Sequence, residues 1–87
     1  MNPPAITIYT AAWCGYCQRA KRLLDEKKLA YTEIDVEATA GARGEMMSRS
    51  NRRTVPQVFI GTRHVGGCDD LYALDRSGEL DRITSGG

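Results

Sequence analysis

Apolar and polar residues follow strand-like and helix-like periods in turn along the first half of the chain. Residues 6–9 (ITIY) are β-branched or aromatic and predict a short strand. Residues 15–28 carry apolar side chains at helical spacing and predict an amphipathic helix. Residues 31–36 alternate and predict a half-buried strand. This succession is typical of a β-α-β unit, whose right-handed crossover makes its two strands parallel.

The next part of the chain predicts a second helix and a hairpin. Thr39 is a suitable N-cap for a helix that runs to about Ser50, with two methionines as its apolar contribution. Residues 57–60 (QVFI) and 63–65 (RHV) are two short segments separated by Gly61-Thr62, which is typical of a β-hairpin. The hairpin would add two antiparallel strands to the parallel pair.

A last helix is predicted to begin at Cys68 or Asp69 and to stop at Gly78. The order of elements is then β-α-β-α-β-β-α. We therefore expect an α/β fold with a four-stranded mixed sheet flanked by helices. The 87 residues suit one domain, residues 1–87, in which 84–87 would form a frayed tail.

Composition and charge exclude several classes of protein. The net charge is +1, whereas a nucleic-acid-binding domain usually carries a strongly basic stripe. The apolar runs are too short to span a membrane, and the first residues lack the charged and apolar regions of a signal peptide. We therefore expect a cytoplasmic protein.

A local excess of arginines lies in the second half of the chain. These side chains either form a solvated face or include an anion site for a small ligand. The residues are Arg49, Arg52, Arg53 and Arg63.

Two cysteines, Cys14 and Cys17, lie at the head of the first predicted helix. A helix N-terminus has unpaired N–H groups and a partial positive charge, so it should stabilise a thiolate at Cys14. Residues three apart in a helical turn meet the Cα separation of roughly 4.4–6.8 Å that a disulfide needs. We expect Cys14 to be an exposed nucleophile and Cys17 to be a buried resolving thiol.

Two other interpretations of the cysteines remain open at this point. The pair could serve as small buried apolar residues, as free cysteines often do. Alternatively, Cys14, Cys17, His64 and Cys68 could form a Cys₃His zinc site. In a reducing cytosol a CxxC pair is more often catalytic or metal-binding than a structural disulfide.

Three separated blocks give the sequence a close resemblance to the glutaredoxin family. They are TAAWCGYC (10–17), TVPQVFIG (54–61) and VGGCDDLYALDRSGEL (65–80). The resemblance implies a thioredoxin-like fold and a monomeric enzyme, with glutathione as co-substrate. It implies reduction of protein disulfides and of protein–glutathione mixed disulfides, with Cys14 and Cys17 as the catalytic pair.

The resemblance also implies a glutathione-binding groove beside the cysteines. Pro56 would be a cis-proline, leaving the backbone N–H and C=O of Val55 available to the cysteine of glutathione. Thr54 would flank the same groove, and Tyr16 would flank the bound sulfur. Without the resemblance, residues 54–56 would be interpreted as an ordinary loop that leads into a strand.

The other end of this groove would be formed by the start of the last helix. Gly67 and Cys68 would bring the backbone and its N–H donors close to the γ-glutamyl carboxylate, and Asp69 would face its ammonium group. Asp69 is also expected to act as an N-cap. Cys68 is expected to be a packing residue, with a regulatory oxidation site as the alternative. Arg43 would contact the glycine carboxylate or lie on a solvated helix face.

Two departures from the family pattern leave alternatives open. Ala11 and Ala12 stand where many members carry lysine, so one cation is missing from the site. Gly15 replaces a common proline, and related proteins with glycine there can hold a [2Fe–2S] cluster. Such an iron–sulfur carrier or sensor would use Cys14 as ligand and would be dimeric. Trp13 is a thioredoxin-like trait, so a reductase supplied by another enzyme is a third possibility.

Overall fold

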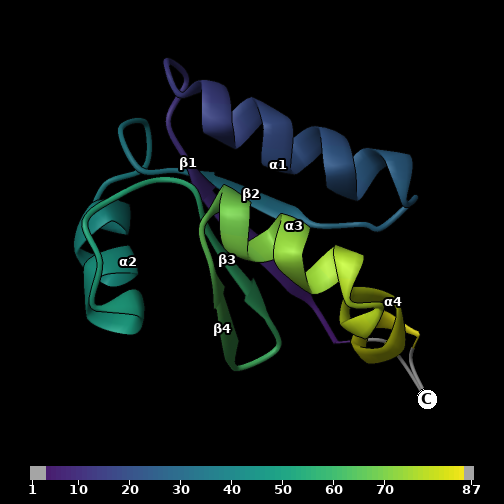
Figure 1. Ribbon diagram of the computed structural model, residues 1–87. Coiled ribbons are helices and arrows are strands. Elements are labelled where there is room, and N and C mark those ends of the chain that lie inside the picture. The colour runs from purple at the N-terminus through teal and green to yellow at the C-terminus, as the bar shows by residue number, and fades with distance from the viewer. Residues whose placement is uncertain (1–3, 86–87) are drawn as a thin grey trace.

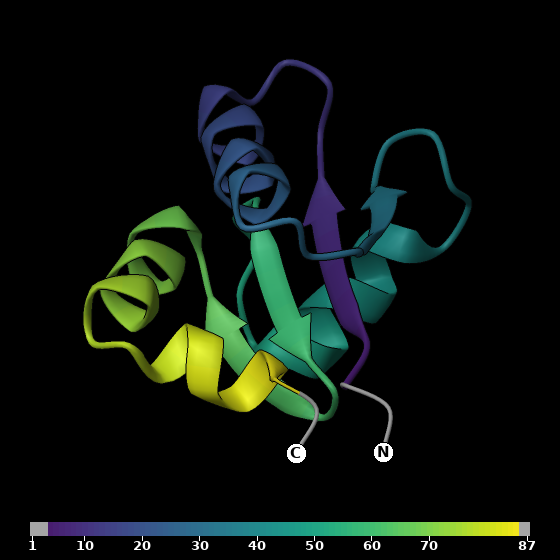
Figure 2. The ribbon, with the colours of Figure 1, turned by 90° about the vertical axis from the view of Figure 1, so that its right-hand side faces the viewer.

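The computed structural model describes residues 4–85, which form a mixed four-stranded sheet covered by helices on both faces (Figures 1 and 2). The strands lie in the order β2-β1-β3-β4, with β1 and β2 parallel and the other pairs antiparallel. The predicted fold class is therefore confirmed. The elements are β1 (Ile6–Thr10), α1 (Gly15–Glu26), β2 (Thr32–Asp35), α2 (Ala42–Ser50), β3 (Gln57–Ile60), β4 (Arg63–Gly66), α3 (Cys68–Arg76) and α4 (Glu79–Thr84).

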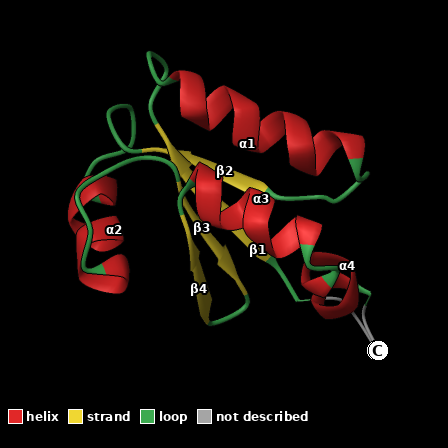
Figure 3. Cartoon of the chain, viewed as in Figure 1, coloured by secondary structure: helices red, strands yellow, loops and turns green. Residues whose placement is uncertain are grey.

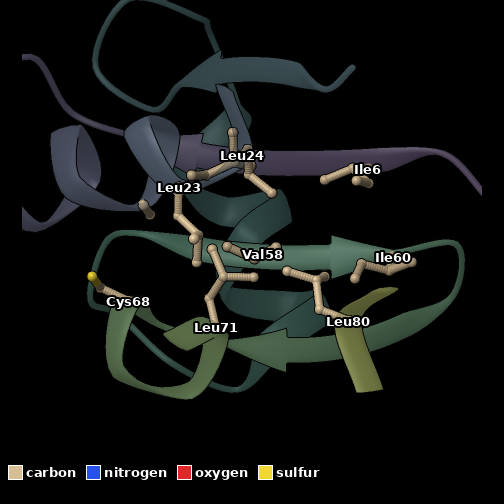
Figure 4. Packing of buried hydrophobic residues seen from close by; sticks show 10 residues of the cluster. Ile6, Leu23, Leu24, Val58, Ile60, Cys68, Leu71 and Leu80 are labelled. Atoms are coloured by element: carbon tan, nitrogen blue, oxygen red, sulfur yellow. The ribbon is translucent and has the colours of Figure 1, made fainter. Parts of the chain in front are cut away.

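One face of the sheet packs against α1, α3 and α4 and forms the larger core cluster (Figure 4). Alternate residues of β1 and β3 point to this face because side chains in a strand alternate between the two sides of the sheet. The apolar stripe of α1 covers them, as its helical spacing predicts. The buried members of the cluster are Ile6, Ile8, Ala20, Leu23, Leu24, Val58, Ile60, Cys68, Leu71 and Leu80.

The other face of the sheet is covered by α2. Tyr9 and Phe59, the intervening residues of β1 and β3, point to this side and meet at an edge-to-face angle of 80°. Met46 is fully buried against them. The Tyr9 hydroxyl accepts a hydrogen bond from Arg49 at 2.9 Å, and the Arg49 guanidinium lies 4.1 Å from the Phe59 ring centroid. One of the four arginines noted in the sequence thus packs on the sheet.

Helix α2 begins later than the sequence predicts. The expected N-cap was Thr39, but the helix starts at Ala42 and its N-cap is Gly41. Gly41 has φ +78°, a left-handed conformation that glycine adopts without steric cost, so the chain turns once more before the helix begins. The predicted end at Ser50 is confirmed.

A fourth helix, α4, follows Gly78 where the sequence predicts only a helix stop. Helix α3 does end before Gly78, whose φ of +82° reverses the chain, but Glu79–Thr84 then form another turn and a half of helix. Leu80 anchors it as a fully buried member of the larger core cluster. Thr84, expected in a frayed tail, ends α4, and residues 86–87 of that tail lie outside the described residues.

Within residues 4–85, no helix is both long enough and apolar enough to span a membrane.

Candidate active site

The topology of the sheet brings three sequence-distant segments to one end of the strands. β1 and β3 are antiparallel, so the end of β1 lies beside the start of β3. β4 is antiparallel to β3, so it ends at the same end of the sheet. Figure 3 shows the loops after β1, before β3 and after β4 at the upper end of the sheet. Cys14, Pro56 and Gly67 lie in these three loops, which is why residues more than 40 positions apart can form one site.

Cys14 is the N-cap of α1, and its sulfur is turned back over the first turn of the helix. Its Sγ accepts a hydrogen bond from the Cys17 backbone N–H at 3.2 Å. That donor and the partial positive charge of the helix N-terminus both favour a sulfur anion over a neutral thiol. Cys14 is only 5% exposed, so the predicted exposure of its side chain is wrong. The capping contact places the sulfur in the floor of a groove rather than on its rim.

Cys17 lies one turn further along α1, on the helix face that packs against the core. It is fully buried, as predicted for the resolving thiol. Burial, with the contact to Cys14 as a second cause, raises the pKa of the Cys17 thiol to about 12. Cys17 is therefore protonated at neutral pH. The two cysteines are both free thiols in this structure.

The loop before β3 forms one wall of the site. The Val55–Pro56 peptide bond is cis, as the family resemblance implies. The Val55 carbonyl oxygen lies 3.5 Å from Cys14 Sγ, so it is partly engaged rather than wholly free. Gln57 supports the loop from the core, because its Nε2 donates to the Thr54 carbonyl at 3.0 Å. His64 in turn lies 2.7 Å from Gln57 Oε1.

The start of α3 forms the opposite wall, and Asp70 rather than Asp69 caps it. The Asp70 carboxylate accepts from the Gly67 N–H at 2.9 Å and from Arg52 at 3.2 Å. The hydrogen bond from Gly67, followed by the pairing with Arg52, lowers the pKa of Asp70. The predicted capping role of Asp69 is therefore wrong, because the capping side chain stands at the third helical position. Asp69 remains exposed toward the groove.

Position 66, just before this helix, must be glycine because the Asp70 side chain lies against it. Its φ is +121°, and a Cβ on it would collide with the Asp70 carboxyl group. Cys68, the first residue of α3, is 4% exposed and packs in the larger core cluster, as expected for a packing residue. Burial raises the pKa of the Cys68 thiol.

Two adjoining cavities of about 270 and 420 Å³ form the groove around Cys14. They share Tyr16, Thr54 and Val55. The larger cavity is lined by Cys14 and Arg43, and the smaller cavity is lined by the start of α3. Every residue that the resemblance assigned to glutathione lines one or the other: Tyr16, Arg43, Thr54, Val55, Pro56, Gly67, Cys68 and Asp69.

Four further residues line the groove that the sequence did not assign to it. They are Trp13, Gly15, Arg53 and Asp70. Trp13 and Tyr16 are 69% and 59% exposed, the highest values among the large apolar side chains of residues 4–85. The local excess of arginines was the signal for Arg53, but sequence alone did not separate it from Arg49, Arg52 and Arg63.

Comparison with known proteins shows the family of this chain. The glutaredoxin family model matches residues 6–65, which covers more than half of the chain. The chain belongs to the glutaredoxin family. Glutaredoxin 3 of Escherichia coli K12 is 53% identical over 78 residues, covering 90% of this chain and 94% of that protein.

Solved glutaredoxin structures share the fold described above. A glutaredoxin from Brucella melitensis is 51% identical, has a TM-score of 0.83, and the match covers 97% of this chain and 91% of that one. A buckwheat glutaredoxin in complex with glutathione is 30% identical and has a TM-score of 0.86. The match covers 94% of this chain and 77% of the buckwheat chain. These relatives support thiol–disulfide oxidoreductase activity for this glutaredoxin, for which the Cys14–Cys17 pair fits a dithiol site.

The zinc interpretation of the cysteines does not agree with this geometry. His64, one of the four proposed ligands, is hydrogen-bonded to Gln57 instead. Within residues 4–85, His, Cys, Asp and Glu side chains do not form a group of three or more that could hold a metal ion.

Proposed function

We propose that this glutaredoxin is a glutathione-dependent oxidoreductase that reduces protein–glutathione mixed disulfides and protein disulfides. The observation that carries the proposal is the position of Cys14 Sγ in the floor of a groove that has arginines at one end and carboxylates at the other. Glutathione is a tripeptide with a carboxylate at its glycine end and an ammonium and a carboxylate at its γ-glutamyl end. We also propose a cytoplasmic location, where glutathione keeps thiols reduced.

The proposed reaction begins with the thiolate of Cys14. It attacks the glutathione sulfur of a mixed disulfide, so a Cys14–glutathione disulfide forms and the substrate sulfur leaves as a thiolate that takes up a proton. A second glutathione thiolate then attacks the glutathione sulfur on Cys14. Oxidised glutathione leaves, and the Cys14 thiolate is restored.

Reduction of a protein disulfide would use both cysteines. Attack by Cys14 gives a mixed disulfide with the protein, and Cys17 then attacks Cys14 Sγ and releases the second protein thiol. Because the pKa of Cys17 is about 12, this thiol must lose a proton before it can attack. Until it does, it competes poorly with glutathione for the disulfide on Cys14. Glutathione therefore has time to resolve a Cys14–glutathione disulfide directly.

The groove supplies binding groups along the length of a bound tripeptide. The backbone of Val55, beside Thr54 and the cis-proline, would pair with the cysteine of glutathione as an added strand would. The N–H groups at the start of α3 would bind the γ-glutamyl carboxylate, and Asp69 would bind its ammonium group. The glutathione complex of the buckwheat relative supports this use of the groove.

We expect the wild-type protein to reduce a small glutathione mixed disulfide at a rate that depends on reduced glutathione. The measurement couples turnover to glutathione reductase and NADPH and compares it with a thioredoxin reductase as the sole electron source. Glutathione should support turnover, and thioredoxin reductase should not. Turnover with thioredoxin reductase alone would instead support the thioredoxin-like alternative.

The iron–sulfur alternative stays a prediction. Cys14 would be the ligand that this chain supplies, because Cys17 is fully buried within α1. The position of a Cβ on Gly15 has no atom within 4 Å, so space beside Cys14 is open. A cluster would provide electron storage or transfer to another protein. Anaerobic reconstitution with iron, sulfide and glutathione should give a coloured dimer, and a colourless monomer would contradict this alternative.

A further inference from the structure

Gln57 is a fully buried polar side chain that directly follows the cis-proline, at the start of β3. Both ends of its amide are hydrogen-bonded. Nε2 donates to the Thr54 carbonyl oxygen at 3.0 Å and lies 3.2 Å from Thr54 Oγ1. Oε1 lies 2.7 Å from His64 Nε2. The side chain therefore links β4, through His64, to the loop that forms one wall of the site.

These hydrogen bonds fix the direction in which the Gln57 amide faces. The Thr54 carbonyl oxygen can only accept, so the amide nitrogen must face it and Oε1 must face His64. Oε1 can also only accept, so His64 Nε2 carries the proton and donates it. Burial, with the Arg52 guanidinium as a second cause, lowers the pKa of His64, so its ring is neutral at pH 7 and has one N–H. With the amide reversed, or with the proton on Nδ1, two acceptors would face each other.

His64 is itself held in place by the sheet. It is paired with Phe59 in the register of β3 and β4, and the centroids of the two rings are 4.9 Å apart at an interplanar angle of 30°. Gln57 and His64 thus both stand on strands, which hold side chains more precisely than loops do. The donor on β4 orients the Gln57 amide, and the Gln57 amide orients the loop.

The contact to the Thr54 carbonyl also determines the direction of the Val55 N–H. These two groups belong to one trans peptide unit, which is planar, so they point in opposite directions. Because the Thr54 carbonyl points to the buried Gln57, the Val55 N–H points away from the core. Thr54 and Val55 line both cavities of the groove, and within residues 4–85 the Val55 N–H has no hydrogen-bond partner. This donor is therefore available to a ligand in the groove.

We propose that Gln57 and His64 are positioning residues that keep the Val55 N–H directed into the groove, where it binds the cysteine carbonyl of glutathione. This inference rests on the proposed use of glutathione. Neither side chain lines the groove, so each acts through the loop. Without them the peptide unit between Thr54 and Val55 can reverse. The groove then loses a donor and presents an acceptor to the carbonyl of the ligand.

The test compares KM and kcat for two mixed disulfides of 2-mercaptoethanol at a fixed, saturating concentration of glutathione. One contains glutathione, and the other contains γ-glutamylcysteamine, which lacks the cysteine carbonyl and the glycine. Gln57→Met replaces the amide with an apolar side chain of similar size. We expect it to raise KM for the glutathione disulfide about fivefold, with kcat changed less than about twofold, because a hydrogen bond to bound substrate is lost. With the γ-glutamylcysteamine disulfide, Gln57→Met and wild type should have nearly equal KM values.

His64 provides a second pair of variants, on a residue that is only partly buried. His64→Phe keeps a ring against Phe59 but removes the donor, so KM for the glutathione disulfide should rise by about two- to threefold. His64→Gln places an amide N–H where Nε2 stands and should restore the wild-type KM. Rescue by this donor separates a positioning role from a contribution to stability alone. If Gln57→Met does not fold, the two His64 variants decide the question.

Thr10→Val is the matched control. Thr10 is buried in β1 and donates to Glu33 at 2.7 Å, so this variant also loses a hydrogen bond within the sheet. It should leave KM unchanged, and iodoacetamide should alkylate Cys14 at the same rate in every variant. An unchanged KM for the glutathione disulfide in Gln57→Met or His64→Phe, once folded, or an equal rise with both disulfides, would overturn the inference. Absence of wild-type turnover with glutathione would instead refute the proposed function itself.

Discussion

Replacing Cys14 with serine is expected to abolish glutathione-coupled reduction of a mixed disulfide, lowering kcat by more than about a hundredfold. Cys14 provides the sulfur that forms the covalent intermediate. It is the cysteine whose Sγ accepts an N–H hydrogen bond at the N-terminus of α1. A serine hydroxyl in the same position has no comparable tendency to ionise. The assay follows NADPH consumption through glutathione reductase, with far-UV circular dichroism confirming that the variant is folded.

Cys17→Ser is expected to retain most of the same activity. Cys17 is fully buried, and its raised pKa of about 12 keeps it protonated, so the glutathione route does not require it. The same variant should lose reduction of an intramolecular protein disulfide, because that route needs a resolving thiol. If Cys14→Ser keeps its mixed-disulfide activity, or if Cys17→Ser is as inactive as Cys14→Ser, the roles assigned to the two thiols are wrong.

Replacing Leu71 with alanine is expected to destabilise the fold by about 2–5 kcal/mol. Leu71 is fully buried between α3 and the sheet, in the larger core cluster. The truncation removes apolar contacts and leaves a cavity that a small core cannot fully close. Domains of this kind have a total stability of only about 5–15 kcal/mol, so the loss is a large fraction of it. Urea unfolding followed by circular dichroism measures the change.

Ala73→Gln provides the control on the same helix. Ala73 is exposed, so its replacement should change the free energy of unfolding by no more than about 0.5 kcal/mol. If Leu71→Ala costs as little as this control, Leu71 does not occupy the packed position that the structure gives it.

The sheet and three of the helices could be predicted because their signals are local. The β-branched run at β1, the alternation at β2 and the apolar stripe of α1 each follow from neighbouring residues. Helix α4 could not be predicted in this way. It is six residues long, too short to be stable alone, and it depends on Leu80 inserting into a core built by distant residues.

The members of the candidate site could largely be predicted, but their detailed contacts could not. The family resemblance predicted the groove, and its residues line two adjoining cavities. The low exposure of Cys14 depends on how its side chain folds back onto the Cys17 N–H and against Val55. The choice of Asp70 over Asp69 as the cap depends on the conformation of Gly66 and on Arg52. Such contacts join three loops and have no local sequence signature.

The central claim is that glutathione is carried on Cys14 during turnover. It is tested most directly by treating Cys17→Ser with oxidised glutathione and locating the adduct by peptide mass spectrometry without reducing agent. We predict one glutathione per chain, on the peptide that contains Cys14, which is released by reduced glutathione. An adduct confined to Cys68, or a Cys14 peptide that stays unmodified, would contradict the account.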